Sequence, residues 1–247
     1  MNARTKLIWG ISLALALAVV PAGASITFSA AGSGALSNLS ASAEFEISGS
    51  NLIITLTNTA TSPALEPADI LTAFFFSLNG VTLTPVSAVL GGSSVVLYDD
   101  APVGGVVGGE WAYESGIAAP GGADQGISST GLSGLFGASS DYFPGDNLDG
   151  EANVGGMAYG IVPASGTTGG NTPVTGPNPF IQDSVIFTLS FTGDLSLDDI
   201  SDVSFQYGTS PSEPNLSVVP EPASLSLLGI GIAFMAVRRG MKKRSTM

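Results

Sequence analysis

Alternating apolar and polar residues in the first third of the chain predict β-strands. Residues 41–48 place small or apolar side chains on one face and hydroxyl or carboxylate side chains on the other, which is the period of two of a half-buried strand. Residues 51–58 alternate in the same way. Because Ser48-Gly49-Ser50 supplies a short turn between them, we expect the two segments to form a β-hairpin.

Later segments extend this pattern. Residues 71–78 contain the continuous aromatic run Phe74–Phe76 and end at Asn79-Gly80, as expected of a strand buried on both faces and followed by a turn. Further strand signals lie at 81–90, 95–98, 110–113, 157–162, 184–192 and 201–207. Apart from one short turn at 195–200, no helix is expected between the two termini, so the sequence predicts an all-β, antiparallel β-sandwich with long Gly-rich loops.

The middle of the chain differs in composition. Residues 91–176 hold 22 of the 33 glycines, which predicts a region dominated by loops. One interpretation is disorder. The aromatic and leucine residues in this region favour the other interpretation, ordered loops packed over a sheet.

The N-terminal 24 residues have the pattern of a secretory signal peptide. Arg4 and Lys6 precede an apolar stretch at 7–20, and Ala22-Gly23-Ala24 offers a cleavage site before Ser25. The alternative, a transmembrane helix, is disfavoured because about 14 apolar residues are too few to span a bilayer. We therefore expect signal peptidase to act here.

The C-terminal end carries a second targeting pattern. Val219-Pro220-Glu221-Pro222 is followed by the apolar run 223–237 and then by basic residues. The prolines favour an extended backbone around Glu221. The apolar run would form a helix of roughly 22 Å, against a hydrocarbon core of about 30 Å, so we expect a short hydrophobic helix rather than a permanent anchor.

This tail resembles the PEP-CTERM domain of bacterial surface proteins. Its parts are the motif, the apolar run and a basic stop made of Arg238, Arg239, Lys242, Lys243 and Arg244. The resemblance implies export through the inner membrane of a Gram-negative-type bacterium, transient membrane contact through 223–237 and cleavage by exosortase. It also implies residence at the cell surface or outside the cell, in association with exopolysaccharide or biofilm. The alternative is an ordinary C-terminal membrane anchor.

Charge restricts the chemistry of the remaining chain. All seven basic residues lie in the two targeting segments, and because Glu221 is one of the 20 acidic residues, residues 25–220 carry 19 carboxylates. They contain no Lys, Arg, His or Cys. Nucleic-acid binding is excluded because nothing neutralises phosphate, and catalysis by His, Cys or Lys is excluded in the same way. We expect no enzymatic activity and no cofactor other than calcium.

The candidate calcium site is an acidic, glycine-containing segment. Its four carboxylates belong to Asp141, Asp146, Asp149 and Glu151. Calcium takes six to eight oxygen ligands, but the EF-hand spacing fails and a solvated acidic loop is the alternative. A second acidic cluster consists of Asp194, Asp198, Asp199 and Asp202, where capping and turn formation compete with cation binding.

A third candidate surrounds Trp111, the one tryptophan of the mature chain. Glu110 and Glu114 flank it, and an aromatic side chain with carboxylates suits a sugar. On one strand these two carboxylates would lie roughly 13 Å apart, which exceeds the separation in a glycosidase acid pair, about 5–9.5 Å. A tryptophan half-buried in a strand is the alternative.

The predicted organisation is a signal peptide at 1–24, an exported domain at 25–209, a stalk at 210–218 and the sorting signal at 219–244. The leading hypothesis is a non-enzymatic surface or extracellular-matrix protein. A polysaccharide-binding module, with or without calcium, is the second hypothesis, and a glycosidase that uses only carboxylates is the third.

Overall fold

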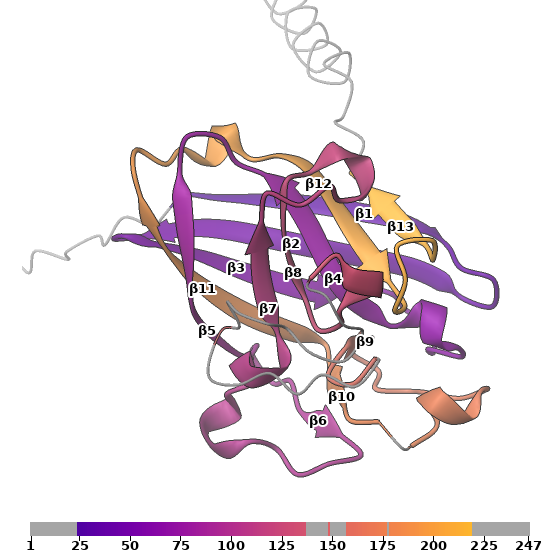
Figure 1. Cartoon of the computed structure of the whole chain (residues 1–247). Helices are drawn as coiled ribbons and strands as arrows, with labels where there is room; N and C mark the ends of the chain where they lie inside the picture. The colour runs from indigo at the N-terminus through magenta and orange to yellow at the C-terminus, as the bar shows by residue number, and fades with distance from the viewer. Residues whose placement is uncertain (1–23, 137–147, 149–156, 177, 219–247) are drawn as a thin grey trace, which may run out of the picture.

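Two sheets packed face to face form the molecule (Figure 1). The computed structural model describes residues 24–136, 148, 157–176 and 178–218. One sheet has five strands in the order β1-β2-β3-β11-β5, and the other has the order β13-β12-β4-β9-β10-β6 with the β7–β8 hairpin attached to β4. Among the described strands, all pairings are antiparallel except that of β9 with β10. The prediction of an antiparallel β-sandwich is confirmed.

The strands of the five-stranded sheet are β1 (Ser25–Ser33), β2 (Asn38–Ser48), β3 (Asn51–Asn58), β5 (Thr82–Leu90) and β11 (Ser184–Thr192). The expected hairpin joins β2 to β3, where Ser48 pairs with Asn51 and Gly49 adopts a φ of 62°. Strand β11 inserts between β3 and β5. This sheet therefore unites the first third of the chain with residues near its C-terminal end.

The strands of the second sheet are β4 (Leu71–Ser77), β6 (Val96–Leu97), β7 (Ala112–Ser115), β8 (Gln125–Ser128), β9 (Ile161–Val162), β10 (Phe180–Gln182), β12 (Ser201–Tyr207) and β13 (Asn215–Ser217). Short 3-10 turns complete the fold: η1 (Pro67–Asp69), η2 (Val103–Gly105), η3 (Gly108–Glu110), η4 (Pro120–Gly122), η5 (Leu132–Gly134), η6 (Thr172–Val174) and η7 (Leu197–Asp199). No helix among the described residues is long and apolar enough to cross a membrane.

Strand β4 is buried along its whole length because both of its faces are covered. Phe74 faces the other sheet, where its ring centroid lies 5.9 Å from that of Phe187. Phe75 faces away from it, toward Phe136 at 6.3 Å. The aromatic run thus supplies two separate hydrophobic cores.

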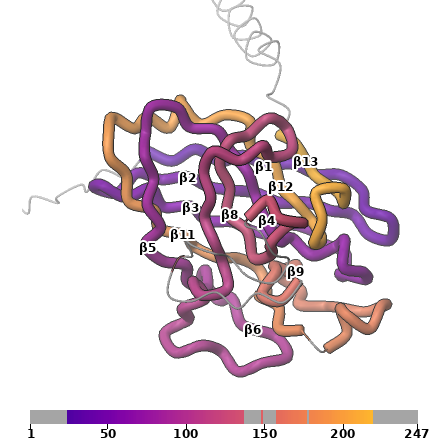
Figure 2. Tube along the Cα trace, in the orientation of Figure 1, coloured from indigo at the N-terminus to yellow at the C-terminus, as the bar shows by residue number. Residues whose placement is uncertain are grey.

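The Gly-rich region at 91–176 covers the face of β4 that points away from the five-stranded sheet. Its β7–β8 hairpin pairs with β4, and its loops lie over this strand in the tube view (Figure 2). Gly126 is required there, because a Cβ at this position would lie 2.5 Å from a ring carbon of Phe75. The described part of residues 91–176 is therefore packed over the sheet.

Several segments differ from the sequence-based expectation. The strand expected at 157–162 is limited to Ile161–Val162 (β9), and β8 and β10 were not expected. The strand expected at 110–113 begins at Ala112, because η3 precedes it. Residues 210–218, expected as a stalk, pack on the domain instead: β13 pairs with β12, and the Glu213 carboxylate accepts hydrogen bonds from the amides of Thr209 and Ser210 at 2.6 and 2.8 Å. Strand β1 was not expected, because its second half consists of Ala, Gly and Ser, which have low strand propensity.

Candidate functional site

The predicted targeting residues lie outside the described residues. They include the cleavage site at Ala22, the motif Val219–Pro222 and the basic stop at 238–244. The structure does describe the two positions from which these segments continue. Ala24 leads into β1, and Val218 follows β13, where its amide donates a 2.9 Å hydrogen bond to the carbonyl of Val203. The sorting motif therefore begins one residue beyond an edge of the second sheet.

The predicted calcium ligands Asp141, Asp146, Asp149 and Glu151 also lie outside the described residues. Within the part of the chain that is described, no group of three or more carboxylates is placed to hold a metal ion. The second acidic cluster is therefore not a gathered site. Part of it forms η7, where the Ser196 hydroxyl accepts a 3.3 Å hydrogen bond from the amide of Asp198, so capping explains that part.

Trp111 is not available to stack on a sugar. Its side chain is fully buried, at 0% exposure, and its ring meets that of Phe187 edge to face at 5.1 Å. Glu110 ends η3, whereas Glu114 lies in β7, so the two carboxylates do not share a strand. Burial raises the pKa of Glu110. The alternative of a structural tryptophan is thus the better one, and the side chain is more deeply buried than expected.

One carboxylate is buried without any cationic side chain to pair with it. Asp69 is 3% exposed, and its Oδ2 accepts hydrogen bonds from the amides of Leu65 and Glu66 at 2.9 and 3.3 Å. Among the described residues, Oδ1 of Asp69 and Oε1 of Glu66 have no hydrogen-bond partner. These two carboxylates supply fewer oxygens than the six to eight that calcium takes, so the clear role of Asp69 is to hold the loop before β4.

Among the described residues, Tyr98 is the one exposed aromatic side chain, at 51%. Its hydroxyl bonds to that of Thr168, and its ring lies edge to face with Phe180 at 6.3 Å. Asp99 and Asp100 follow it and are exposed. A positive φ of 65° orients this residue, which is uncommon outside glycine. Sequence reasoning missed Tyr98 because neither its exposure nor its backbone conformation is visible in a strand-like pattern.

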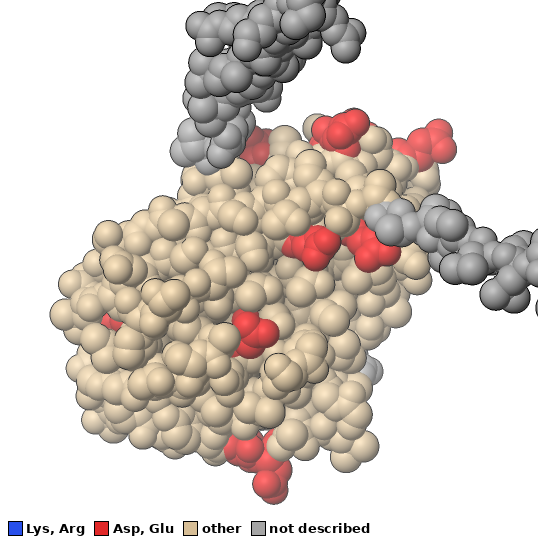
Figure 3. Space-filling model, turned by 180° about the vertical axis from the view of Figure 1, so that it is seen from behind, with Lys and Arg blue, Asp and Glu red and all other residues tan. Residues whose placement is uncertain are grey.

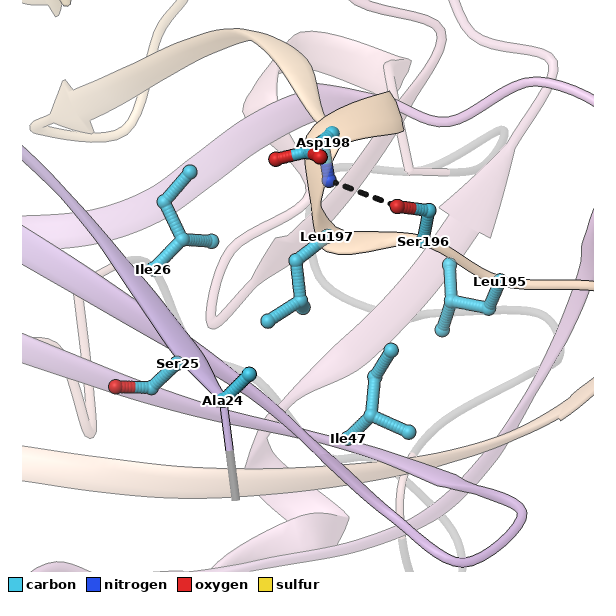
Figure 4. A pocket seen from close by; sticks show the side chains of 8 residues that line it. All are labelled: Ala24, Ser25, Ile26, Ile47, Leu195, Ser196, Leu197 and Asp198. Carbon is cyan, nitrogen blue, oxygen red and sulfur yellow. Dashed lines mark hydrogen bonds between the residues drawn. The ribbon is translucent and has the colours of Figure 1, made fainter. Parts of the chain in front are cut away.

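Acidic side chains are spread over the surface rather than gathered. On the face seen in Figure 3 they occur singly or in small groups among uncharged residues. An open, mainly apolar pocket of about 440 Å³ lies at one end of the sandwich (Figure 4). It is lined by Ala24, Ser25, Ile26, Ile47, Leu195, Ser196, Leu197 and Asp198. With one carboxylate and two hydroxyl groups, this lining offers apolar contact rather than catalysis.

Comparison with known proteins identifies the tail. The family model of the PEP-CTERM protein-sorting motif matches residues 218–240, which include the motif, the apolar run and the first two basic residues. No curated protein and no solved structure matches the chain. The match lies at the position where the tail resembles such a signal. The chain therefore carries a C-terminal PEP-CTERM sorting signal, which indicates export to the cell surface through exosortase in a Gram-negative-type bacterium.

Proposed function

We propose that the delivered protein is a non-enzymatic structural component of the cell surface or extracellular matrix, associated with exopolysaccharide. The observation that carries this proposal is the composition of residues 25–218, which include carboxylates but no Lys, Arg, His or Cys. Nucleophilic, Schiff-base and zinc-dependent chemistry all need residue types that are missing from this region. The carboxylates flanking Trp111 lie on different elements, which weakens the case for a glycosidase.

Processing and delivery can be tested together in cells with active exosortase. An epitope tag inserted at the exposed Asp100–Ala101 link leaves both termini free. We expect the tag in the surface or extracellular fraction, and mass spectrometry of the C-terminus should show loss of the apolar run and the basic stop. A matched variant with Pro220, Glu221 and Pro222 all changed to Ala should keep its tail. Full-length wild-type protein in the inner membrane would contradict the sorting step.

Polysaccharide binding is the more specific form of this proposal, and Tyr98 is the residue that favours it. The half-exposed ring of Tyr98 is held at its hydroxyl by Thr168 and lies edge to face with Phe180. It offers a fixed apolar surface, with two carboxylates beside it to accept hydrogen bonds from sugar hydroxyls.

Affinity electrophoresis against exopolysaccharide from the producing strain tests this role. Wild-type protein should be retained, and Tyr98→Ala should lose most of the retention. The control is Val103→Ala, because Val103 is 95% exposed and follows on the same loop. Repeating the assay with a chelator separates calcium-assisted from calcium-independent binding. Equal retention of the two variants would remove Tyr98 from the site, and no retention of wild type would refute binding.

A further inference from the structure

The sandwich is open on the side where β1 forms its edge. Strand β1 pairs with β2 over all nine of its residues, and among the described residues no strand pairs with its other side. Its inward face is only partly covered. Ile26, Phe28 and Ala30 are of intermediate exposure, whereas four inward residues of the neighbouring β2 are at 0–2%: Leu39, Ala41, Ala43 and Phe45.

The same opening extends to the second sheet. Strand β13 lies beside β1 (Figure 1), and a Cβ at Gly32 would lie 2.5 Å from a methyl carbon of Leu216. Leu216 is also only partly buried. The pocket in Figure 4 continues the opening at the start of β1, where Ile26 and Leu197 both belong to its lining. A strip of half-covered apolar side chains therefore borders a row of unpaired backbone groups.

The other sheet edges have features that block pairing. Strand β5 carries Pro85 and a register shift, and a bridge from Val89 to Val106 covers one end. Strands β6, β13 and β7, the last being the outer strand of the β7–β8 hairpin, have two, three and four residues. Such short, kinked or proline-containing edges resist association. Strand β1 has nine residues, no proline and no charged side chain, so it lacks these protections.

We propose that β1 binds β1 of a second copy of this chain, antiparallel and centred on Ser29, so that the five-stranded sheets of two molecules become one sheet. This register pairs all nine residues. On the inward face it sets Phe28 opposite Ala30 and Ile26 opposite Gly32, so each large side chain meets a small one. Shifting the centre to residue 28 would set Phe28 against itself, and shifting it to residue 30 would leave Ile26 without a strand partner.

Two copies of this acidic chain should repel each other less at the β1 edge than elsewhere on the surface, because β1 has no charged side chain. Residues 25–218 carry 19 carboxylates and no basic side chain, so two copies repel each other. The nearest carboxylate on the outward face of the joined sheet belongs to Glu44, whose strand neighbour is Thr27. Glu44 and Glu44 of the second copy are separated by three strand spacings, about 14 Å or more, which exceeds the Debye length of about 8 Å at physiological salt. The dimer should therefore strengthen with ionic strength.

The second copy would also reach the pocket. In this register its turn at 34–37 lies beyond Ser25, next to Ala24. That turn carries Leu36, a large apolar residue that is 59% exposed. The pairing thus brings an exposed apolar residue to an open apolar pocket, twice in a symmetric dimer.

Single cysteines test the register in a chain that contains none. Residue 29 would face itself across the two-fold axis, with Cα atoms about 4.5–5.5 Å apart, which is within the range of a disulfide. We expect processed Ser29→Cys protein, purified from cells, to form a covalent dimer on mild oxidation. Thr27→Cys should not, because two residues 27 would lie roughly 14 Å apart. Thr84→Cys, on the opposite edge strand β5, is the matched surface control.

Sedimentation of the same processed protein tests the equilibrium. Wild type should be dimeric at concentrations of about 100 μM, more so in high salt, and Ser29→Glu should weaken the dimer about tenfold because two carboxylates face each other. Mixing Ser29→Glu with Ser29→Lys should restore it. Thr84→Glu adds the same charge and should have no effect. A wild-type monomer at every salt concentration, or cross-linking of all three cysteine variants alike, would overturn the proposal without touching the evidence for export or polysaccharide association.

Discussion

Replacement of Trp111 distinguishes a structural from a sugar-binding tryptophan. Burying a ring of this size removes about 150–250 Å² from water, and truncation of a buried Trp to Ala typically costs about 3–5 kcal/mol. The edge-to-face contact with Phe187 at 5.1 Å is part of that cost. Its Nε1 has no hydrogen-bond partner among the described residues. Because a buried, unpaired N–H costs about 1–3 kcal/mol, it offsets part of the stability gained by burying the ring.

Two variants separate these contributions. Trp111→Ala should lower the free energy of unfolding by about 3–5 kcal/mol, which is roughly 6–20 °C in Tm for a domain of this size. Trp111→Phe keeps a ring against Phe187 and removes the unpaired N–H. We therefore expect it to lie within about 2 kcal/mol of wild type. Urea unfolding followed by circular dichroism measures both.

Fluorescence supplies an independent check, because Trp111 is the one tryptophan of residues 25–220. The processed protein should show blue-shifted emission that acrylamide quenches poorly, and urea should shift the emission to the red. Glycan retention of Trp111→Phe should equal that of wild type. Readily quenched, red-shifted emission of the native protein, or a Trp111→Ala variant as stable as wild type, would refute the reasoning.

Three other predictions concern the carboxylates. Burial raises the pKa of Glu110 above its ordinary 4.5, so this group favours the folded state most at pH values below 4.5 and its contribution is lost as pH rises through the raised value. Glu110→Gln should therefore raise Tm at pH 7 but not at pH 3, and an equal effect at both pH values would contradict this. Asp69→Ala leaves the partly buried amides of Leu65 and Glu66 without their acceptor and should cost about 1–3 kcal/mol in urea unfolding. Asp69→Asn should cost less, and the reverse order would argue against this hydrogen-bonding role. The Tm of wild type should rise with ionic strength because its carboxylates repel one another; a flat or falling response would mean that they are already compensated.

The distribution of hydroxyl, apolar and aromatic residues predicted much of the framework. The hairpin β2–β3, the buried strand β4 and the alternating strand β11 each carry a local signal, because residues two apart share a face of a strand. The C-terminal sorting signal could also be predicted from the sequence, since a motif, an apolar run and basic residues follow one another along the chain. Edge strands were harder to predict: β1 and β13 are short of β-branched residues, so their pairing is visible in the structure and not in a local pattern.

Candidate site residues were predictable only in part. Spacing placed carboxylates beside Trp111, but it could not show that the ring turns toward Phe187 rather than toward solvent. The exposure of Tyr98 likewise depends on Thr168 and Phe180, which lie far along the chain.

The sequence by itself determined the export signals, the strand content and the absence of the residue types that nucleophilic, Schiff-base and zinc-dependent chemistry need. Each of these depends on which residues are present or on their immediate order. Only the tertiary structure decided which aromatic ring is exposed, which carboxylate is buried and which sheet edge is open. These properties depend on contacts between segments such as β1 and β13, or β4 and the Gly-rich loops, that lie far apart along the chain and are brought together only by the packing of the two sheets.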